Sequence, residues 1–305
     1  MKVVINTSSF GKFDASPLNE LKKEDVEFSL NPYKRQLTQE EVIDLSKEAV
    51  GIIAGTEPLN THVLNQLSRL KVISRCGSGL DNVDLKAAQE KGIKVFSTPL
   101  GPTIAVAELA LGLVLSLLRK THIMNDQLKS GKWEKVMGNL LFGKNVGIVG
   151  YGRIGQEVAK RLKAFGCHMA YFDIKGEMAE VEGQYLPLEE LLAWADIICL
   201  HVSKSQQDGF LITEKEIKIM KEGSWLVNCS RGGVVDEEAL YRALKSGRLS
   251  GAAVDVFEKE PYTGSLRNLD NVLLTPHIGS YAKEARIQME KEAVHNLLKS
   301  LRGEL

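Results

Sequence analysis

The chain has 305 residues, more than one small hydrophobic core can use, so its length favours two domains. Lysine plus arginine and aspartate plus glutamate both total 39, so the formal net charge is zero and nothing favours binding to nucleic acid or to an anionic membrane. The hydrophobic content of 44% is typical of a soluble globular protein.

The four cysteines, at positions 76, 167, 199 and 229, indicate a reducing compartment. None forms a CxxC pair, and three lie in or beside apolar segments, so they are expected to be small buried hydrophobes rather than disulfide partners or zinc ligands. The N-terminal segment, Met1–Ile5, is predicted to begin a strand and lacks the pattern of a signal peptide. We expect a cytoplasmic protein with no bound metal.

Residues 1–97 are expected to form one α/β domain. The expected strands are Lys2–Asn6, Val26–Leu30, Val50–Ala54, Lys71–Arg75 and Ile93–Ser97. Helices are expected between them, one opening with a capping box at Thr38–Glu41 and others at Asn60–Leu70 and Asp84–Lys91. This alternation predicts a parallel sheet covered by helices on both faces.

The segment Ser97–Pro102, with two prolines and a glycine, predicts a crossover to a second domain. A long helix, Ile104–Arg119, is expected to be buried nearly all round, and its apolar run Leu109–Leu118 is too short to cross a bilayer. Residues 125–142 are expected to be irregular and to expose Trp133. A contact with another subunit is the favoured explanation, and packing on the same domain is the alternative.

A dinucleotide-binding pattern follows the apolar strand Asn145–Val149. It reads Gly150-x-Gly152-x-x-Gly155 and leads into a helix expected at Gln156–Phe165. The first glycine permits a sharp turn, the second lets a pyrophosphate approach the backbone, and the third lets helix and strand pack closely. The phosphates would bind at the N-terminus of the helix.

Asp173 completes this pattern. It ends the next expected strand, His168–Phe172, 23 residues beyond Gly150, close to the roughly 20 expected for the acid that binds the adenine ribose. A carboxylate there repels a 2′-phosphate, so NAD is favoured over NADP, although Lys175 leaves NADP open. A glycine-rich turn with a solvated aspartate is the structural alternative.

The same alternation of strand and helix continues to the C-terminus. Further strands are expected at Asp196–His201, Ser224–Cys229, Gly251–Val256 and Asn271–Leu274, and helices at Leu188–Trp194, Thr213–Met220, Glu237–Ser246 and Glu284–Arg302. Ligands of such sheets bind outside the carboxyl ends of the strands. Arg231, the acids Asp255, Glu258 and Glu260, and His277 all follow such ends.

These side chains suit the reduction of a carbonyl. An arginine can bind a carboxylate through two hydrogen bonds and polarise a neighbouring keto oxygen, and a histidine can protonate that oxygen as a hydride arrives. A carboxylate behind the histidine fixes its tautomer. Each residue alone could be an ordinary loop residue, but together, beside a dinucleotide motif, they favour catalysis.

The sequence resembles the D-isomer-specific 2-hydroxyacid dehydrogenase family, and within it the phosphoglycerate dehydrogenases. The similar stretches are Arg75–Asp84, Gly150–Gly155, Asn228–Glu237, Gly251–Pro261 and Pro276–Ser280, in the order of the family. The resemblance implies an NAD-binding Rossmann domain at 98–280 and a flavodoxin-like substrate domain at 1–97 that is completed by the C-terminal helix at 281–305. It also implies a homodimer acting on a small 2-hydroxyacid or 2-ketoacid.

The resemblance also implies roles for individual residues. Arg231 would bind the substrate and polarise its carbonyl, His277 would be the acid–base, and Glu260 rather than Glu258 would be its partner. Ser78 and Gly79 would bind the substrate carboxylate, together with Arg231 and His277. The implied cofactor residues are Gly150, Gly152, Arg153, Ile154, Gly155, Asp173, Val202, Cys229, Ser230, Asp255, Gly279 and Ser280.

Two departures from the family pattern concern the cofactor loop and the substrate. The usual proline two residues after His201 is replaced by Ser203, followed by Lys204. The stretch Ala54–Glu57 holds an acid and no cation where phosphoglycerate dehydrogenases carry a basic residue, which speaks against a phosphorylated substrate and favours a small uncharged side chain. Lys135 or Arg75 could substitute for that cation.

Two alternatives to this activity are consistent with the same fold. A formate-dehydrogenase-like role is disfavoured because Glu260 stands where that branch departs. An NAD(H)-binding sensor or corepressor on the same fold would turn nothing over. The combination of Arg231, Glu260 and His277 argues against the sensor, since sensing alone requires none of them.

Overall fold

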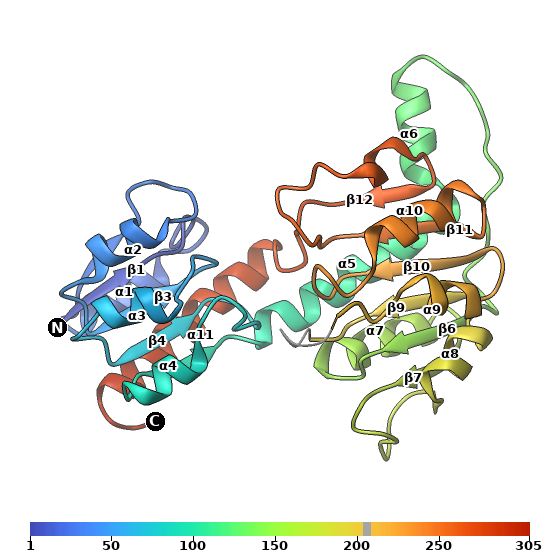
Figure 1. The fold of residues 1–305 in the computed structure, drawn as a ribbon. Helices are drawn as coiled ribbons and strands as arrows, with labels where there is room; N and C mark the ends of the chain where they lie inside the picture. The colour runs from blue at the N-terminus through green and yellow to red at the C-terminus, as the bar shows by residue number, and fades with distance from the viewer. Residues whose placement is uncertain (204–208) are drawn as a thin grey trace. The chain divides into compact units, whose positions relative to one another are not determined.

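The computed structural model describes residues 1–203 and 209–305. The chain divides into two compact units, one made of Met1–Ala105 with Ser280–Leu305 and the other of Val106–Gly279 (Figure 1). The first boundary falls eight residues beyond the expected end of the substrate domain at residue 97, because helix α5 (Leu100–Arg119) begins in the first unit and continues in the second. Lys204 lies outside the described residues.

The first unit contains a five-stranded sheet whose ladders are all parallel. Its strands are β1 (Lys2–Ile5), β2 (Glu27–Leu30), β3 (Gly51–Ala54), β4 (Val72–Arg75) and β5 (Lys94–Ser97). Their spatial order, β2-β1-β3-β4-β5, is the flavodoxin-like order 2-1-3-4-5. The expected flavodoxin-like fold is therefore confirmed.

Helices cover both faces of this sheet. The helices are α1 (Ser16–Lys23), α2 (Gln39–Ser46), α3 (Thr61–Gln66), α4 (Leu85–Glu90) and α11 (Lys283–Leu301). One apolar core joins β3 and β4 to α2, α3 and α4, and the other joins β1 to α1 and α11. In Figure 1 the red C-terminal helix lies among the blue and cyan strands of the N-terminal region. The expected capping box at Thr38 and Glu41 is formed.

The second unit contains a seven-stranded parallel sheet. Its strands are β6 (Asn145–Val149), β7 (His168–Phe172), β8 (Gln184–Tyr185), β9 (Ile197–Leu200), β10 (Ser224–Asn228), β11 (Leu249–Val254) and β12 (Val272–Leu274). The spatial order β12-β11-β10-β9-β6-β7-β8 is the Rossmann order with one added edge strand. The sequence pattern missed β8 and the 3-10 helix Ser265–Asn268, which are too short to show a period.

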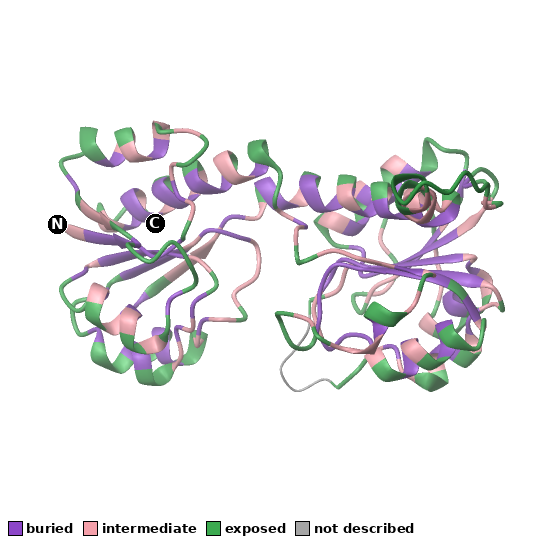
Figure 2. Ribbon diagram, turned by 90° about the horizontal axis from the view of Figure 1, so that it is seen from above, coloured by how far each residue is buried: buried purple, intermediate pink, exposed green. Residues whose placement is uncertain are grey.

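This second sheet is also doubly wound. The helices that cover it are α7 (Arg153–Lys163), α8 (Leu188–Trp194), α9 (Glu214–Ile219), α10 (Glu237–Lys245) and the later turns of α5. One core packs α5 and α7 against the sheet, and another packs α8, α9 and α10 against the opposite face. The buried strands between partly exposed helices are evident in Figure 2.

Helix α5 differs from its prediction in two ways. It starts at Leu100, four residues early, because Pro102 is tolerated in the first turn of a helix. It is not buried all round, since Leu100 is 58% exposed and Ile104 is 42% exposed. Within the described residues it is the one helix long and apolar enough to span a bilayer, yet half of that apolar stretch is buried in the protein, as in a core helix.

The segment after α5 also differs from the prediction. Helix α6 (Thr121–Lys129) occupies part of the stretch expected to be irregular, and residues 130–142 then follow without regular structure. Trp133 is 82% exposed and Met137 is 88% exposed, so the alternative that Trp133 packs on its own domain is wrong. Leu140 and Phe142 are exposed as well, which leaves an apolar surface on this segment.

Candidate functional site

The glycine loop after β6 has the geometry that its three glycines require. Gly150 has a φ of +89°, and a Cβ there would lie 2.7 Å from the carbonyl oxygen of His201. A Cβ on Gly155 would lie 2.2 Å from the Gly150 carbonyl oxygen, so α7 can approach the loop only without a side chain. The space beside Gly152 is open. The loop therefore leaves room for a ligand at Gly152 and is closely packed at the other two glycines.

Asp173 holds this loop from the end of β7. Its Oδ2 accepts a hydrogen bond from the Tyr151 N–H (2.8 Å), and its Oδ1 accepts one from the Lys175 N–H (3.0 Å). Helix α7 begins after Gly152, with no side-chain cap and no acid in its first turn. The amide groups of Arg153 and Ile154 can therefore bind an anion, and the residues present fit a dinucleotide.

His277 and Glu260 form a pair at the carboxyl edge of the second sheet. The Nδ1 of His277 lies 2.9 Å from Oε2 and 3.1 Å from Oε1 of Glu260. The side chains are 50% and 39% exposed, which keeps them open to a ligand. Because the carboxylate engages Nδ1, Nε2 is the nitrogen left for proton transfer.

Asp255 fixes the segment that carries His277. Its carboxylate accepts hydrogen bonds from Thr275 Oγ1 (2.6 Å), the Ile278 N–H (2.8 Å) and the Gly279 N–H (2.9 Å). Burial raises the pKa of this carboxyl group, and the three donors oppose that effect. Both oxygens are thus used to hold the loop after β12.

The loop after β10 carries Arg231. Asn228 Oδ1 accepts hydrogen bonds from the N–H (3.1 Å) and the hydroxyl (2.6 Å) of Ser230, and Arg231 Nη1 donates to the Ser230 carbonyl (2.8 Å). A Cβ on Gly232 would lie 1.8 Å from the Phe257 carbonyl oxygen, so this loop packs directly on the loop after β11. The Phe257 N–H donates to Glu260 Oε1 (3.1 Å). A continuous set of contacts thus joins the loops of Arg231, Glu260 and His277.

The other expected residues lie in several places. Val202 contacts the Gly150 turn, since its Cγ1 is 2.9 Å from the Cβ position of that glycine. Cys229 is buried at the end of β10, and burial raises the pKa of its thiol well above the ordinary value. Ser78 and Gly79 follow β4 in the first unit, and Ser280 also belongs to that unit.

Two residues that hold the site together were not singled out from the sequence. Asn228 organises the Arg231 loop, and Thr275 binds Asp255. Both lie at the end of a strand, where a polar side chain beside an apolar run could have signalled them. The cysteines, all four free and buried, agree with their expected packing role.

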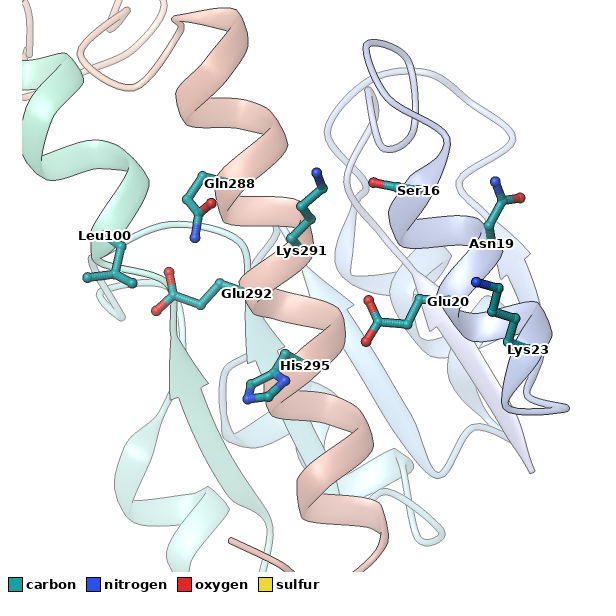
Figure 3. A pocket seen from close by; sticks show the side chains of 9 residues that line it. All are labelled: Ser16, Asn19, Glu20, Lys23, Leu100, Gln288, Lys291, Glu292 and His295. Atoms are coloured by element: carbon teal, nitrogen blue, oxygen red, sulfur yellow. The ribbon is translucent and has the colours of Figure 1, made fainter.

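A groove of about 700 Å³ lies elsewhere, between α1 and α11 of the first unit (Figure 3). Its lining includes the acids Glu20 and Glu292 and the bases Lys23, Lys291 and His295. These side chains come from two helices on one face of the sheet rather than from strand ends. The mixed charge and this position give it no part in the site described above.

Comparison with known proteins agrees with this geometry. The family model "D-isomer specific 2-hydroxyacid dehydrogenase, NAD binding domain" matches residues 111–279. A D-3-phosphoglycerate dehydrogenase of Methanocaldococcus jannaschii is 42% identical over 88% of this chain, and a hydroxypyruvate reductase of Thermotoga maritima is 39% identical over 92% of it and 96% of its own length. The chain spans about half (53%) of the first of these relatives.

Solved structures have the same fold. The TT0316 protein of Thermus thermophilus aligns with a TM-score of 0.91 at 36% identity, covering 99% of this chain and 97% of that one. The sheet order, the glycine loop and Asp173 define the second unit as a nicotinamide-dinucleotide-binding α/β domain. More closely, the chain belongs to the D-isomer-specific 2-hydroxyacid dehydrogenase family, and its second unit is the NAD-binding domain of that family.

Proposed function

We propose that the protein is an NAD-dependent D-2-hydroxyacid dehydrogenase that reduces small 2-ketoacids. The observation that carries this proposal is the contact between His277 Nδ1 and Glu260 Oε2 at 2.9 Å, with both side chains partly open to solvent. A half-exposed histidine oriented by a carboxylate is suited to proton exchange with a ligand. Family membership and the linked Arg231 loop support the same chemistry.

NADH, when bound, would supply the hydride for the keto carbon. Arg231 binds the substrate carboxylate through its planar guanidinium and polarises the keto oxygen. His277 donates the proton of Nε2 to that oxygen, and Glu260 stabilises the ring orientation throughout. In the reverse direction His277 accepts the hydroxyl proton.

The proposed cofactor contacts come from the glycine loop and the strand ends around it. Gly150, Gly152, Arg153, Ile154 and Gly155 would hold the pyrophosphate, and Asp173 the adenine ribose. We propose that Val202, Cys229, Ser230, Asp255, Gly279 and Ser280 line the nicotinamide side, and that Ser78 and Gly79 bind the substrate carboxylate.

Two further proposals concern the setting of the enzyme. A homodimer is proposed, supported by the exposed apolar surface at Trp133, Met137, Leu140 and Phe142. Light scattering at several concentrations measures the molar mass directly. A cytoplasmic location is proposed because the four cysteines are free and buried, as expected in a reducing compartment.

The test is NADH oxidation at 340 nm with glyoxylate, hydroxypyruvate, pyruvate, a branched 2-ketoacid and phosphohydroxypyruvate. We expect turnover of at least one of them, and a fall in kcat/KM of about 10²–10⁴-fold in His277→Asn with NADH binding retained. Unchanged turnover in this variant would refute the mechanism. Tight NADH binding without turnover of any ketoacid would favour the sensor on the same fold.

A further inference from the structure

The loop after β11 carries Glu260, the carboxylate that pairs with His277. The loop begins at Asp255 and leads to the 3-10 helix Ser265–Asn268. The carboxylate of Asp255 binds the loop after β12, as described above. The position of Glu260 therefore depends on other contacts of its own loop.

Glu237, the first residue of helix α10, binds the loop of Glu260 directly. Its Oε1 accepts a hydrogen bond from the Glu258 N–H (2.8 Å), two residues before Glu260. The next residue of the helix, Glu238, accepts a hydrogen bond from the hydroxyl of Ser265 (3.1 Å), which follows Glu260 along the chain. The first turn of α10 thus binds the Glu260 segment both before and after that residue, and all of these groups belong to the second unit.

The peptide group between Phe257 and Glu258 is the point at which this loop is held. Gly232 packs against it, since a Cβ on that glycine would lie 1.8 Å from the Phe257 carbonyl oxygen and 2.8 Å from the Glu258 nitrogen. The Phe257 N–H donates to Glu260 Oε1 (3.1 Å), and the Phe257 ring stacks on Tyr262 with the ring centroids 4.2 Å apart. A shift of this peptide group would therefore move the donor that binds Glu260.

The carboxylate of Glu237 is only partly exposed, so its hydrogen bond competes less with water than one on an open surface. Burial raises the pKa of Glu237, and the charges of Glu258, Glu238 and Asp236 act in the same direction, whereas the Glu258 N–H opposes the rise. Asp236 caps α10 by accepting the N–H groups of Glu238 and Ala239, each at 3.0 Å. The start of the helix that carries Glu237 is therefore itself fixed.

We propose that Glu237 is a positioning residue that keeps Glu260 against Nδ1 of His277. Its carboxylate holds the peptide group at Glu258 and acts through the loop, without touching a ligand. Glu237 also follows Arg231 on one segment of the chain, so that segment supplies the substrate-binding arginine and sets the partner of the histidine. This inference rests on the proposed function and adds a residue to its mechanism.

The experiment measures kcat and KM for the preferred ketoacid, and the Kd for NADH, in three variants of Glu237. Glu237→Ala removes the acceptor, whereas Glu237→Asp keeps a charge that suits the first turn of a helix but is too short to reach the Glu258 N–H. We expect both to lower kcat by about tenfold, with KM and the Kd for NADH little changed. Glu237→Gln keeps an oxygen at the same reach and should retain most of kcat. Glu222→Ala, which removes an exposed acid from the same unit, should leave kcat unchanged.

A double-mutant cycle separates this role from a merely structural one. If Glu237 acts through Glu260, E237A/E260Q should have the kcat of E260Q alone, whereas independent losses would multiply. Thermal unfolding of each variant shows that it is folded. Multiplied losses would overturn the inference, as would an unchanged kcat in folded E237D or equal losses in E237Q and E237A.

The same measurements distinguish the inference from the proposed function. A kcat that falls in E260Q but not in E237A would overturn the role of Glu237 and leave the proposed function intact. A wild-type protein that reduces none of the ketoacids would overturn the proposed function, and the inference with it.

Discussion

The carboxyl edges of the two sheets use charged side chains in opposite ways. In the second unit His277 and Glu260 are paired but 50% and 39% exposed, so they can meet a ligand. In the first unit Glu57 and Glu290 are each 1% exposed; Glu57 accepts the Gly55 N–H of its own loop, and Glu290 of α11 accepts the Gly11 N–H of the loop after β1. Both sheets are parallel and doubly wound, so topology places the two edges but burial decides their use. The second edge is suited to proton exchange with a ligand, whereas the buried acids of the first unit hold the loops of that unit.

After His277→Asn, the largest expected effect concerns Arg231 in the second unit. Replacing it with lysine keeps the charge but removes the planar pair of donors that a carboxylate requires. We expect kcat/KM for the preferred ketoacid to fall on the order of 10²–10³-fold. Steady-state NADH oxidation measures this. Full activity in R231K would contradict this prediction, because it would show that Arg231 acts only through its charge.

A somewhat smaller effect is expected for Glu260→Gln. The amide can offer its NH₂ group to Nδ1 of His277 and so hold the ring in the wrong tautomer. We expect kcat to fall by about 10²-fold, the lower end of the contribution of a general acid. Glu258→Gln is the matched control, because Glu258 is an exposed acid two residues away. Equal losses in both variants would contradict a specific role for Glu260.

Gly155→Ala should weaken cofactor binding. The new Cβ would lie 2.2 Å from the Gly150 carbonyl oxygen, so the loop or α7 must move. We expect the Kd for NADH to rise by about tenfold and the free energy of unfolding to fall by about 1–3 kcal/mol. Fluorescence titration with NADH gives the Kd. Gly112→Ala in α5, where a Cβ meets nothing within 4 Å, should leave NADH binding unchanged.

The smallest effects are opposite pH dependences of stability in the two units. In the second unit burial raises the pKa of Asp196, but hydrogen bonds from the Asn145 N–H and Lys221 outweigh it and lower the pKa overall. The stability that Asp196 contributes is thus present above its ordinary pKa and lost as the pH falls through the lowered one. In the first unit burial raises the pKa of Glu290, so its contribution is present below its ordinary pKa and lost as the pH rises through the raised one.

Asp196→Asn and Glu290→Gln test these signs. Asp196→Asn should lower the free energy of unfolding at neutral pH by about 1–2 kcal/mol and remove the loss in acid. Glu290→Gln should remove the loss that occurs as the pH rises through the raised pKa of this carboxyl group. Denaturant unfolding at a series of pH values measures both. If the pH dependence of the free energy of unfolding changed in the same direction in both variants, the two acids would not act on stability with opposite signs.

The sequence predicted the parts of the fold that depend on local pattern. Buried parallel strands such as β6 and β10 are apolar runs that end at glycine or at a polar residue, and the alternation of strand and helix predicted that both sheets are parallel. Burial of α5 was overestimated because its composition is apolar on all sides, whereas its exposure depends on what it packs against. A short edge strand such as β8 has too few residues to show any period.

The site residues were predictable in type and order, and the pairing of Glu260 with His277, expected from the resemblance, is formed, but the contacts that join the loops were not predictable. Arg231, Glu260 and His277 were expected from strand ends, yet the contact of Gly232 with the Phe257 carbonyl depends on how two distant loops pack. The burial of Glu57 was likewise invisible in the stretch Ala54–Glu57, which records an acid but not its hydrogen-bond partners. Tertiary contacts, rather than residue types, determine these features.

The exposed segment after α6 carries a tryptophan whose intrinsic fluorescence can report on the surroundings of that segment. Trp133 is 82% exposed, whereas Trp225 is 9% exposed and lies in the sheet of the second unit. Their emission should therefore differ in wavelength and in quenching by acrylamide, with Trp133 contributing the red-shifted, readily quenched component. If the segment becomes covered when two chains associate, that component shifts to the blue as the protein concentration rises, and no label has to be attached to follow it.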